Sequence, residues 1–217
     1  MSELTLIIGN KNYSSWSLRP WILARHLGLT FSEQLIPLNQ NDSAARLRAA
    51  NPTGRVPALR HGDLLVWDSL SICEYLCELT SCGLPAEPAA RAWARSVSAE
   101  MHAGFQALRQ QWPMNTRAIG RHTSMTPALQ KDLTRIEAIW TDCRLRYAAV
   151  GPWLFGDYSI ADAMYAPIAL RFRTYGAQLT SAAQSYMATV VADEFMREWL
   201  SAAVAEPWTI DSEEVGL

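Results

Sequence analysis

Two short motifs in this chain could together bind a small acidic peptide. In the first, Pro57 follows Val56 at the start of a short apolar run. A proline cannot donate to a sheet ladder, so Pro57 is expected at an edge or at the first position of a strand. If the bond before Pro57 is cis, the backbone groups of Val56 can face solvent and pair with a peptide-like ligand. In the second motif, Asp68 and Ser69 begin an expected helix, where a hydroxyl and free N–H groups suit a carboxylate.

A pair of serines could act on the thiol of a ligand. Ser14 and Ser15 follow the first expected strand and open the first expected helix, where the helix dipole favours negative charge. A hydroxyl there can donate a hydrogen bond to a bound thiolate, without being a nucleophile, and so lower the thiol pKa below about 8.5. The alternative is that both serines only cap the helix. The presence of the Val56-Pro57 and Asp68-Ser69 motifs favours the role in thiolate binding.

Apolar residues at spacings of three and four predict one long amphipathic helix over residues 93–112, ended by Pro113. His102, Arg109 and Trp112 lie on this helix. These side chains could face a cleft between two domains. The alternative is that this surface only packs on a neighbouring helix.

A second helix start has a structural interpretation. Ser159 and Asp162 have the spacing of a capping box, in which each side chain satisfies a backbone N–H of the other residue. We expect this segment to nucleate a helix and to take no part in chemistry.

The elements that position these residues fall into two groups. Strands and helices alternate as β-α-β-α-β-β-α, at residues 4–8, 15–27, 31–38, 43–50, 56–60, 64–67 and 69–80. This order predicts a small mixed sheet with helices on both faces. A linker marked by Pro and Gly follows at residues 82–88, and the strand signal fades beyond it. We therefore predict an α+β domain at residues 1–81 and an all-α helical-bundle domain at residues 88–217, with a loose or surface-lying tail at 211–214.

The composition is that of an ordinary globular chain. It has 217 residues, 49% hydrophobic content and a formal net charge of −2, so nothing draws it to nucleic acid or to an anionic membrane. No membrane span or signal peptide is expected, and the expected location is cytoplasmic. The four cysteines and four histidines lack the spacing of a metal or redox site. We expect no metal, and free thiols that are buried or half-buried. Serine-hydrolase and phosphate-loop motifs are absent from the sequence.

Four segments, taken in their order and spacing, resemble the cytosolic glutathione transferase superfamily over nearly the whole chain. They are Ser14 to Arg19, Asn51 to Pro57, Asp68 to Ile72 and Gly156 to Asp162. The first segment is most similar to the zeta class, and residues 100–105 with 113–115 are similar to a bacterial group of these proteins. The resemblance implies a thioredoxin-like N-terminal domain with glutathione as co-substrate. It also implies an all-α domain that supplies a pocket for a small hydrophobic electrophile, a homodimer, and a role in detoxification.

Carried over by position, the resemblance assigns the thiol and the cysteinyl backbone of glutathione. Ser14 would face the sulfur, with Ser15 as the alternative if the loop register differs by one. Val56 would pair with the cysteinyl backbone, ahead of a cis Pro57.

The two ends of glutathione are assigned in the same way. Ser69 would bind the γ-glutamyl carboxylate, and Asp68 would face the amine. Arg55 and Gln40 would hold the glycyl end, and the capping serine of the later helix would stay outside the active site.

Trp16 departs from the pattern, because the zeta class has Cys at this point. Tryptophan cannot form a mixed disulfide and is far bulkier. The resemblance thus implies a transferase that conjugates glutathione to an electrophile. Its alternatives are a glutathione-dependent cis-trans isomerase like maleylacetoacetate isomerase, and a non-catalytic dimer that binds glutathione or another ligand.

Overall fold

The structure is a computed structural model that describes residues 3–216. Residues 1, 2 and 217, at the outer ends of the two predicted domains, lie outside the described residues. The first elements are β1 (Leu4–Ile8), α1 (Ser15–His26), β2 (Ser32–Leu35), α2 (Ser43–Ala50), β3 (Ala58–His61), β4 (Leu64–Val66) and α3 (Ser69–Thr80). They are followed by α4 (Pro88–Ala103), α5 (Gln106–Gln111), α6 (Pro127–Tyr147), α7 (Ile160–Tyr175), α8 (Ser181–Ala192), α9 (Glu194–Ala205) and the short 3-10 helix η1 (Asp211–Glu213). The predicted α+β part followed by an all-α part is confirmed.

The sheet is mixed, as the element order predicts. Its strand order is β2-β1-β3-β4, with β1 parallel to β2 and antiparallel to β3. The second strand ends at Leu35 instead of the predicted residue 38. Pro37 has no N–H to donate, and the N–H of Leu38 bonds to the side-chain oxygen of Asn10 at 2.7 Å. The chain therefore leaves the ladder toward the loop that precedes α1.

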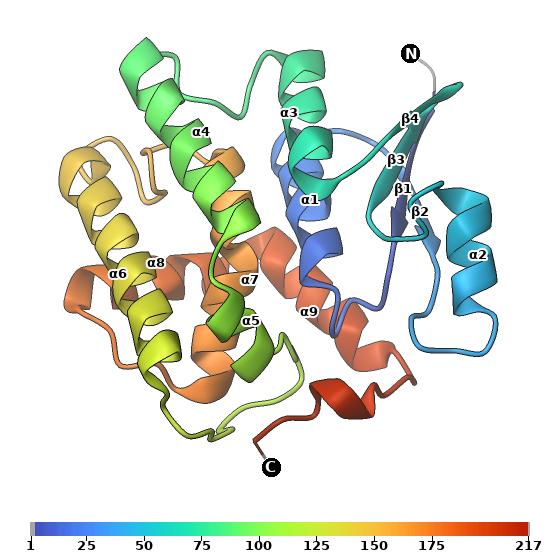
Figure 1. The fold of residues 1–217 in the computed structure, drawn as a ribbon. Coiled ribbons are helices and arrows are strands. Elements are labelled where there is room, and N and C mark those ends of the chain that lie inside the picture. The colour runs from blue at the N-terminus through green and yellow to red at the C-terminus, as the bar shows by residue number, and fades with distance from the viewer. Residues whose placement is uncertain (1–2, 217) are drawn as a thin grey trace.

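Helices cover both faces of the sheet, and one face carries most of the core. Figure 1 shows α2 on the outer face, with α1 and α3 between the sheet and the remaining helices. Along β1, Leu6 and Ile8 point into the large core, which continues into the helical domain. Ile7 points to the opposite face, where it joins a small cluster under α2. Since α1 packs on both α3 and α7, the start of α1 lies where the two parts of the chain meet.

The helix predicted over residues 93–112 is two helices, and this part of the prediction is wrong. α4 ends at Ala103, and Phe105 has a left-handed backbone with φ 61° before α5 begins. At Gly104, a Cβ would lie 2.8 Å from the carbonyl oxygen of Glu100, so this path suits a residue without a side chain. The Arg109 guanidinium then folds back onto the end of α4, where it donates to the carbonyls of Gly104, at 2.9 Å, and of Met101. These bonds satisfy carbonyls that the break leaves without helical partners.

The capping box at the start of α7 is confirmed. The Asp162 carboxylate accepts hydrogen bonds from the N–H of Leu154, the N–H and hydroxyl of Ser159, and the hydroxyl of Tyr186. Burial raises the pKa of Asp162, and these bonds oppose that shift. The carboxylate thus joins the end of a loop to two helices of the second domain.

The C-terminal tail lies on the surface, as one of the two predicted alternatives has it, but it is bound to both domains and is not loose. Glu214 accepts hydrogen bonds from the hydroxyl of Tyr13, at 2.7 Å, and from the amide of Asn115, at 2.8 Å. It also pairs with Arg121 at 2.6 Å. The tail therefore ties the loop before α1 to the segment that follows α5.

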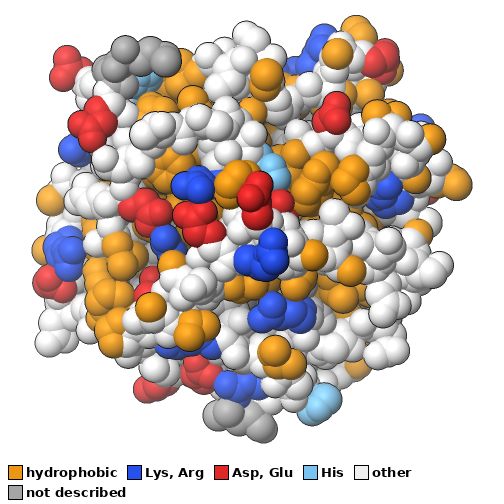
Figure 2. Space-filling model, turned by 180° about the vertical axis from the view of Figure 1, so that it is seen from behind, with side chains coloured by type: hydrophobic (Ala, Val, Ile, Leu, Met, Phe, Trp, Pro, Cys, Tyr) orange, Lys and Arg blue, Asp and Glu red, His pale blue; other side chains and the backbone are white. Residues whose placement is uncertain are grey.

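The surface carries charges of both signs, interspersed with apolar side chains on the face drawn in Figure 2. Between residues 3 and 216, no helix combines the length and the apolar character that crossing a bilayer demands. Over the same span, no three His, Cys, Asp or Glu side chains gather as a metal site. Cys73, Cys77 and Cys143 are buried free thiols, and Cys82 is exposed, contrary to expectation.

Candidate functional site

The start of α3 holds an acid and a buried hydroxyl close together. Asp68 caps the helix, and its Oδ1 accepts the N–H groups of Leu70, at 3.0 Å, and of Ser71, at 3.4 Å. Its Oδ2 lies 3.1 Å from Nε2 of His102, which belongs to α4. Ser69 is fully buried, and its Oγ has no hydrogen-bond partner among residues 3–216. A hydroxyl and an acid are thus presented at the positive end of a helix, as the sequence predicts.

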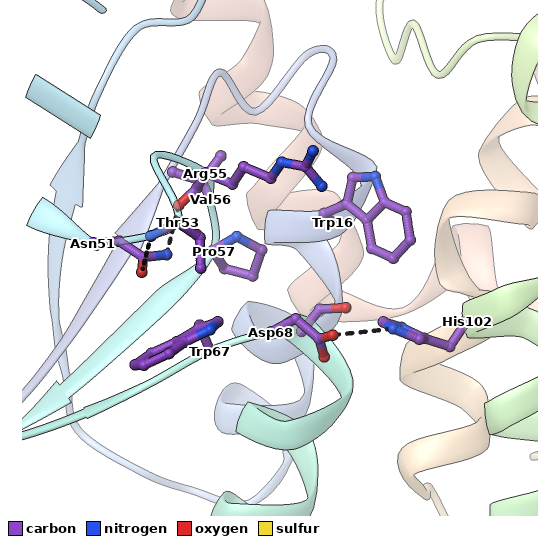
Figure 3. Close-up of a pocket in the computed structure, with 10 residues that line it drawn as sticks. Trp16, Asn51, Thr53, Arg55, Val56, Pro57, Trp67, Asp68 and His102 are labelled. Atoms are coloured by element: carbon purple, nitrogen blue, oxygen red, sulfur yellow. Dashed lines mark hydrogen bonds and ion pairs between the residues drawn. The ribbon is translucent and has the colours of Figure 1, made fainter. Parts of the chain in front are cut away.

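These residues line a cavity of about 460 Å³, called here the Asp68 cavity. Its other walls are Trp16, Asn51, Thr53, Arg55, Val56, Pro57, Trp67 and His102. Figure 3 shows Asp68 reaching across to His102, with Trp16 above the pair and Val56 and Pro57 opposite. The Val56–Pro57 bond is cis, as predicted. Val56 lies before β3, outside the ladder in which Ala58 pairs with Ile7.

The start of α1 carries a short chain of hydroxyls. Ser17 is fully buried, and its Oγ accepts the N–H of Gly9 at 3.1 Å. It lies 2.7 Å from the Oγ of Ser14, the N-cap residue. The geometry allows either hydroxyl to donate, and we assign Ser17 as the donor, because its Oγ already accepts the Gly9 N–H and this bond then uses its own hydrogen as well. The hydroxyl hydrogen of Ser14 is then available to a ligand.

Ser15 is oriented from the other domain. The Nη2 of Arg171, on α7, lies 3.3 Å from the Ser15 Oγ. Because a guanidinium only donates, Ser15 accepts this bond and keeps its own hydrogen free. Both serines line a second cavity of about 490 Å³, called here the serine cavity.

Trp16 lies in the wall between the two cavities. It lines both of them, together with Arg55 and Val56. The guanidinium carbons of Arg19 and Arg109 lie 4.3 Å and 4.7 Å from the centre of its ring. Arginine attracts an aromatic face at such distances. Trp16 is therefore fixed by cations from α1 and α5.

Positive charge concentrates behind the two serines. Burial, helped by the nearby Arg109, lowers the pKa of Arg171 to about 10 and that of Arg19 to about 9. Burial also raises the pKa of Glu213, which lines the serine cavity, while Arg171 opposes this shift. The field at the serine cavity therefore favours an anion, such as a thiolate or a carboxylate.

Tyr13 lines the serine cavity but is already engaged. Its hydroxyl donates to Glu214 at 2.7 Å and accepts from the Nη2 of Arg117 at 3.0 Å. Its one hydroxyl hydrogen is thus used inside the protein, whereas those of Ser14 and Ser15 are not. Of these three hydroxyls, only the two serines can serve a ligand as donors.

The structure brings most of the predicted site residues together. Those that line one or both cavities are Ser14, Ser15, Arg55, Val56, Pro57, Asp68, Ser69, His102 and Arg109. Gln40 lines neither cavity. It lies in a separate surface hollow whose lining also includes Asn39 and Gly54. Trp112 also lies elsewhere: it stacks on Tyr175 at 5.2 Å and lines a separate cavity. The break at Gly104 explains this, because α5 does not continue the face of α4 on which His102 lies.

Sequence reasoning missed Arg171 and Glu213. Arg171 interrupts the apolar run from Pro167 to Phe172, and an arginine inside a buried helix is itself a signal of function. Glu213 offers no comparable signal, because its place depends on how the tail folds back.

The comparisons with known proteins concern the N-terminal part of the chain and the fold. Residues 13–79 match the family described as Glutathione S-transferase, N-terminal domain. A probable glutathione S-transferase, GSTF2, from Oryza sativa subsp. japonica is 59% identical over 29 residues. That alignment covers 13% of this chain and only 14% of the rice protein.

Solved structures show the fold over nearly the whole chain. The structure is similar to a glutathione transferase homolog from Burkholderia gl BGR1 with bound glutathione (TM-score 0.72, 21% identity, 94% of this chain and 100% of that one). It is also similar to maleyl pyruvate isomerase, described as a bacterial glutathione S-transferase in the zeta class (TM-score 0.70, 20% identity, 95% and 100%). A theta class enzyme from Xanthomonas axonopodis pv. citri with glutathione bound has a TM-score of 0.64 at 20% identity, over 96% and 100%.

Proposed function

We propose that this chain, which has the fold of the glutathione transferases and matches their N-terminal domain over residues 13–79, conjugates reduced glutathione to an electrophile. The glutathione thiol loses its proton to solvent and remains as a thiolate beside Ser14. The thiolate sulfur forms a bond to an electrophilic carbon, and the leaving group departs with its bonding electrons. Ser14 acts by hydrogen bonding, so no covalent enzyme intermediate forms.

The γ-glutamyl end of glutathione would lie at the start of α3. The hydroxyl of Ser69 and the helix N-terminus receive the carboxylate, and Asp68 faces the amine. Val56 pairs with the cysteinyl backbone, and Arg55 lies beside the glycyl carboxylate. Each of these four residues lines the Asp68 cavity.

One observation carries this proposal: Val56, Arg55 and Trp16 line both cavities. A short peptide held at Ser69 that runs along Val56 therefore reaches the serine cavity with its next side chain. The hydroxyls of Ser14 and Ser15 line that cavity, and their hydrogens are free to bond to the sulfur.

Conjugation is favoured over isomerisation because Trp16 replaces the cysteine of the zeta pattern. The indole forms part of the cavity wall and is held by two arginines. We include maleylacetone beside 1-chloro-2,4-dinitrobenzene in the assay, since isomerisation returns glutathione unchanged and conjugation consumes it. Glutathione consumption then separates the two reactions.

We also propose a cytoplasmic homodimer. Three apolar side chains on β4, α3 and the segment between them are exposed: Leu64 at 48%, Trp67 at 45% and Leu79 at 43%. Burying such side chains against a second copy is favourable. Light scattering after size-exclusion chromatography measures the mass and would give a monomer if this proposal is wrong.

The first test is binding. Calorimetric titration with glutathione should show saturable binding that Ser69→Ala weakens about tenfold, since one hydrogen bond to a charged group is lost. Ser96→Ala is the matched control, because Ser96 is an exposed serine on α4 whose hydroxyl, among residues 3–216, bonds only to the carbonyl of Ala92. If wild type fails to bind, or if both variants bind alike, the proposed site is wrong. Turnover of 1-chloro-2,4-dinitrobenzene then decides between an enzyme and a binding protein.

A further inference from the structure

A separate cavity lies in the helical domain, apart from the proposed glutathione site. It has a volume of about 260 Å³ and is called here the Trp112 cavity. Its walls come from the end of α5, the loop at residues 122–125, α6, and the end of α7 with the loop that follows. Figure 1 shows α6 on the side of the molecule away from the sheet. Within residues 3–216, its lining shares no residue with the Asp68 cavity or the serine cavity.

Two buried aromatic rings form one wall of this cavity. Trp112 and Tyr175 stack with an interplanar angle of 7°, and they are 4% and 6% exposed. Apolar side chains from three of the surrounding segments add to the lining: Met125, Leu133, Ala177 and Leu179. Such walls favour an apolar body. The volume lies just below the usual range for ligand pockets, so we expect a small ligand with one ring.

The polar part of the lining carries one acid in a fixed position. The Oε1 of Glu137 accepts the backbone N–H of Thr180, which precedes α8. Glu137 is half-buried, and it forms no ion pair with any residue between 3 and 216. A carboxylate has a second oxygen that can accept further hydrogen bonds. That oxygen is therefore left as a charged acceptor for a ligand.

The other polar side chains of the lining do not neutralise this acid. Neither Lys nor Arg lines the cavity in the part of the chain that the structure describes. Four of its polar residues are uncharged: Thr123, Gln130, Thr134 and Gln178. His122 is the second titratable residue there, and it is exposed. Since solvent screens an exposed charge, the half-buried Glu137 sets the sign of the charge that the cavity favours.

We propose that the Trp112 cavity is a second small-molecule site, which binds an aromatic ring joined by a short chain to an ammonium group. The ammonium donates to the carboxylate of Glu137, and the ring lies among the apolar side chains beside Trp112 and Tyr175. This site goes beyond the proposed conjugation and does not depend on it, because glutathione and its electrophile are assigned to the other two cavities.

Two other kinds of ligand predict different results. A purely apolar ligand would bind through the ring alone, so an amine and the matching alcohol would have the same affinity. A ligand held by His122 would carry a negative charge, so a carboxylate would bind more tightly than either. The discriminating measurement therefore compares three ligands of similar shape and different charge.

The experiment uses the whole protein with 2-phenylethylamine, 2-phenylethanol and phenylacetate as probes. Ligand-observed NMR titration measures the affinity of each. We expect the amine to bind about tenfold more tightly than the alcohol, the ratio for one charge-assisted hydrogen bond. Phenylacetate should bind more weakly than the alcohol, because its carboxylate faces Glu137. Equal affinity for amine and alcohol, a preference for phenylacetate, or no binding of the amine overturns the proposal.

A first variant assigns the preference to the acid. Glu137→Gln keeps an oxygen for the N–H of Thr180 but removes the charge, so the amine-to-alcohol affinity ratio should fall to about one. Glu194→Gln, at an exposed position on α9, removes the same charge elsewhere and is the matched control, which should keep the ratio. If the Glu137 variant keeps the preference, the ammonium lies elsewhere and the proposal is wrong.

A second variant tests the cavity itself without changing its charge. Thr134 is exposed on α6 and lines the cavity, so Thr134→Trp should occupy part of that space and weaken amine binding about tenfold or more. Ala138→Trp, exposed on the same helix and outside the lining, is the matched control. Equal amine affinity in these two variants would mean that the amine binds at another place.

S-methylglutathione separates this site from the proposed glutathione site. The amine should remain bound when the protein is saturated with S-methylglutathione, because the cavities share no lining residue. Displacement of the amine in proportion to S-methylglutathione occupancy would place it in the serine cavity and overturn the proposal. A protein that binds the amine through Glu137 but does not bind S-methylglutathione supports this site and overturns the proposed function.

Discussion

Two buried serines begin helices in this molecule, and they differ in where their hydroxyl hydrogens go. At α7, Ser159 donates its hydrogen to Asp162, three residues later, at 2.9 Å. At α1, the residue three positions after Ser14 is Ser17, which has no charge. The Ser17 Oγ accepts the N–H of Gly9 and donates its own hydrogen to Ser14. The hydroxyl hydrogen of Ser14 is therefore free to point into the serine cavity. The first arrangement is complete within the protein, and the second leaves a donor for a ligand or for water.

The contrast shows that a helix-capping serine has no fixed use. The residue three positions after the capping serine determines where the hydroxyl hydrogen of that serine goes. An acid at that position accepts the hydrogen, whereas a serine there can donate to the capping hydroxyl instead. The charges nearby follow the same division. Asp162 is an acid enclosed by donors, whereas Ser15 accepts a bond from Arg171. We therefore expect changes at α7 to act on stability and changes at α1 to act on the thiol.

The largest effect is expected at the capping box of α7, whose hydrogen bonds are complete within the protein. Asp162→Ala removes the acceptor of several buried donors, each worth about 1–3 kcal/mol, so the free energy of unfolding should fall by about 3 kcal/mol or more. Urea unfolding measures it. Asp162→Asn keeps one acceptor oxygen and should lose less. A loss below about 1 kcal/mol in the alanine variant would mean that the box contributes little.

The next effect concerns the thiol. Ser14→Ala removes a donor to the thiolate and should raise the pKa of bound glutathione by about 1–2 units, since a hydrogen bond to a charged group contributes about 1.5–3 kcal/mol. Thiolate absorbance, titrated against pH, reports the pKa directly. The unfolding free energy should fall by only about 1 kcal/mol, the usual loss for a helix cap.

Ser159→Ala is the matched control for this prediction. It also removes a buried helix-capping hydroxyl, yet it should leave the pKa of the bound thiol unchanged. If Ser15→Ala shifts the thiol pKa and Ser14→Ala does not, the sulfur lies at the hydroxyl that Arg171 orients. The contrast between α1 and α7 would then hold with Ser15 in the active role.

Local signals in the sequence predicted much of the fold and part of the site. The strands, the three helices of the first domain and the capping box depend on residues close in sequence, and the structure has them. The Val56-Pro57 and Asp68-Ser69 motifs also work locally, because each sits at the start of its own element. Their meeting in one cavity followed from the resemblance and from the order of the elements.

The rest depended on contacts between distant residues. The break between α4 and α5 has one local cue, Gly104, and is completed by the Arg109 side chain that folds back on α4. The apolar pattern continues across the break, so periodicity alone predicts one helix. Arg171 meets Ser15 across 156 positions, and Glu213 lies in a tail whose neighbouring Glu214 is bound by Tyr13 and by residues of the second domain. No local pattern encodes such contacts.

A smaller effect is expected at the residue behind Ser14. Ser17→Ala keeps the Ser14 hydroxyl but removes the donor that orients it, so the thiol pKa should rise by less than about one unit. The same titration measures it. Ser17→Asp brings an acid to the position that Asp162 holds in α7 and should raise the pKa more, because the acid accepts the Ser14 hydrogen and repels the thiolate. A lower pKa in the aspartate variant would contradict the comparison.

The smallest effect concerns pH and the acid of the serine cavity. The charged groups on its walls are Arg55, Arg109, Arg171 and Glu213, and Tyr13 is the remaining titratable side chain. Burial raises the pKa of Glu213. As the pH falls toward that pKa, Glu213 gains a proton and loses its charge, while benzoate stays ionised, since ordinary carboxyl groups titrate near about pH 4. Benzoate, used as a small anionic probe of this cavity, should therefore bind more tightly as the pH falls from neutrality through the raised pKa of Glu213.

Glu213→Gln removes this dependence. The variant should bind benzoate about threefold more tightly than wild type at neutral pH, as for the loss of one partly screened charge contact, and its affinity should be flat with pH. Benzamide, titrated in parallel, is neutral. Any pH dependence in its affinity therefore measures changes in the cavity other than its charge, and it is subtracted from the benzoate result. If the Gln variant keeps the slope of wild type, the titrating group lies elsewhere, and Glu213 does not set the charge that the cavity accepts. If the slope disappears, the charge that the cavity accepts depends on a tail residue that neither helix start could have revealed.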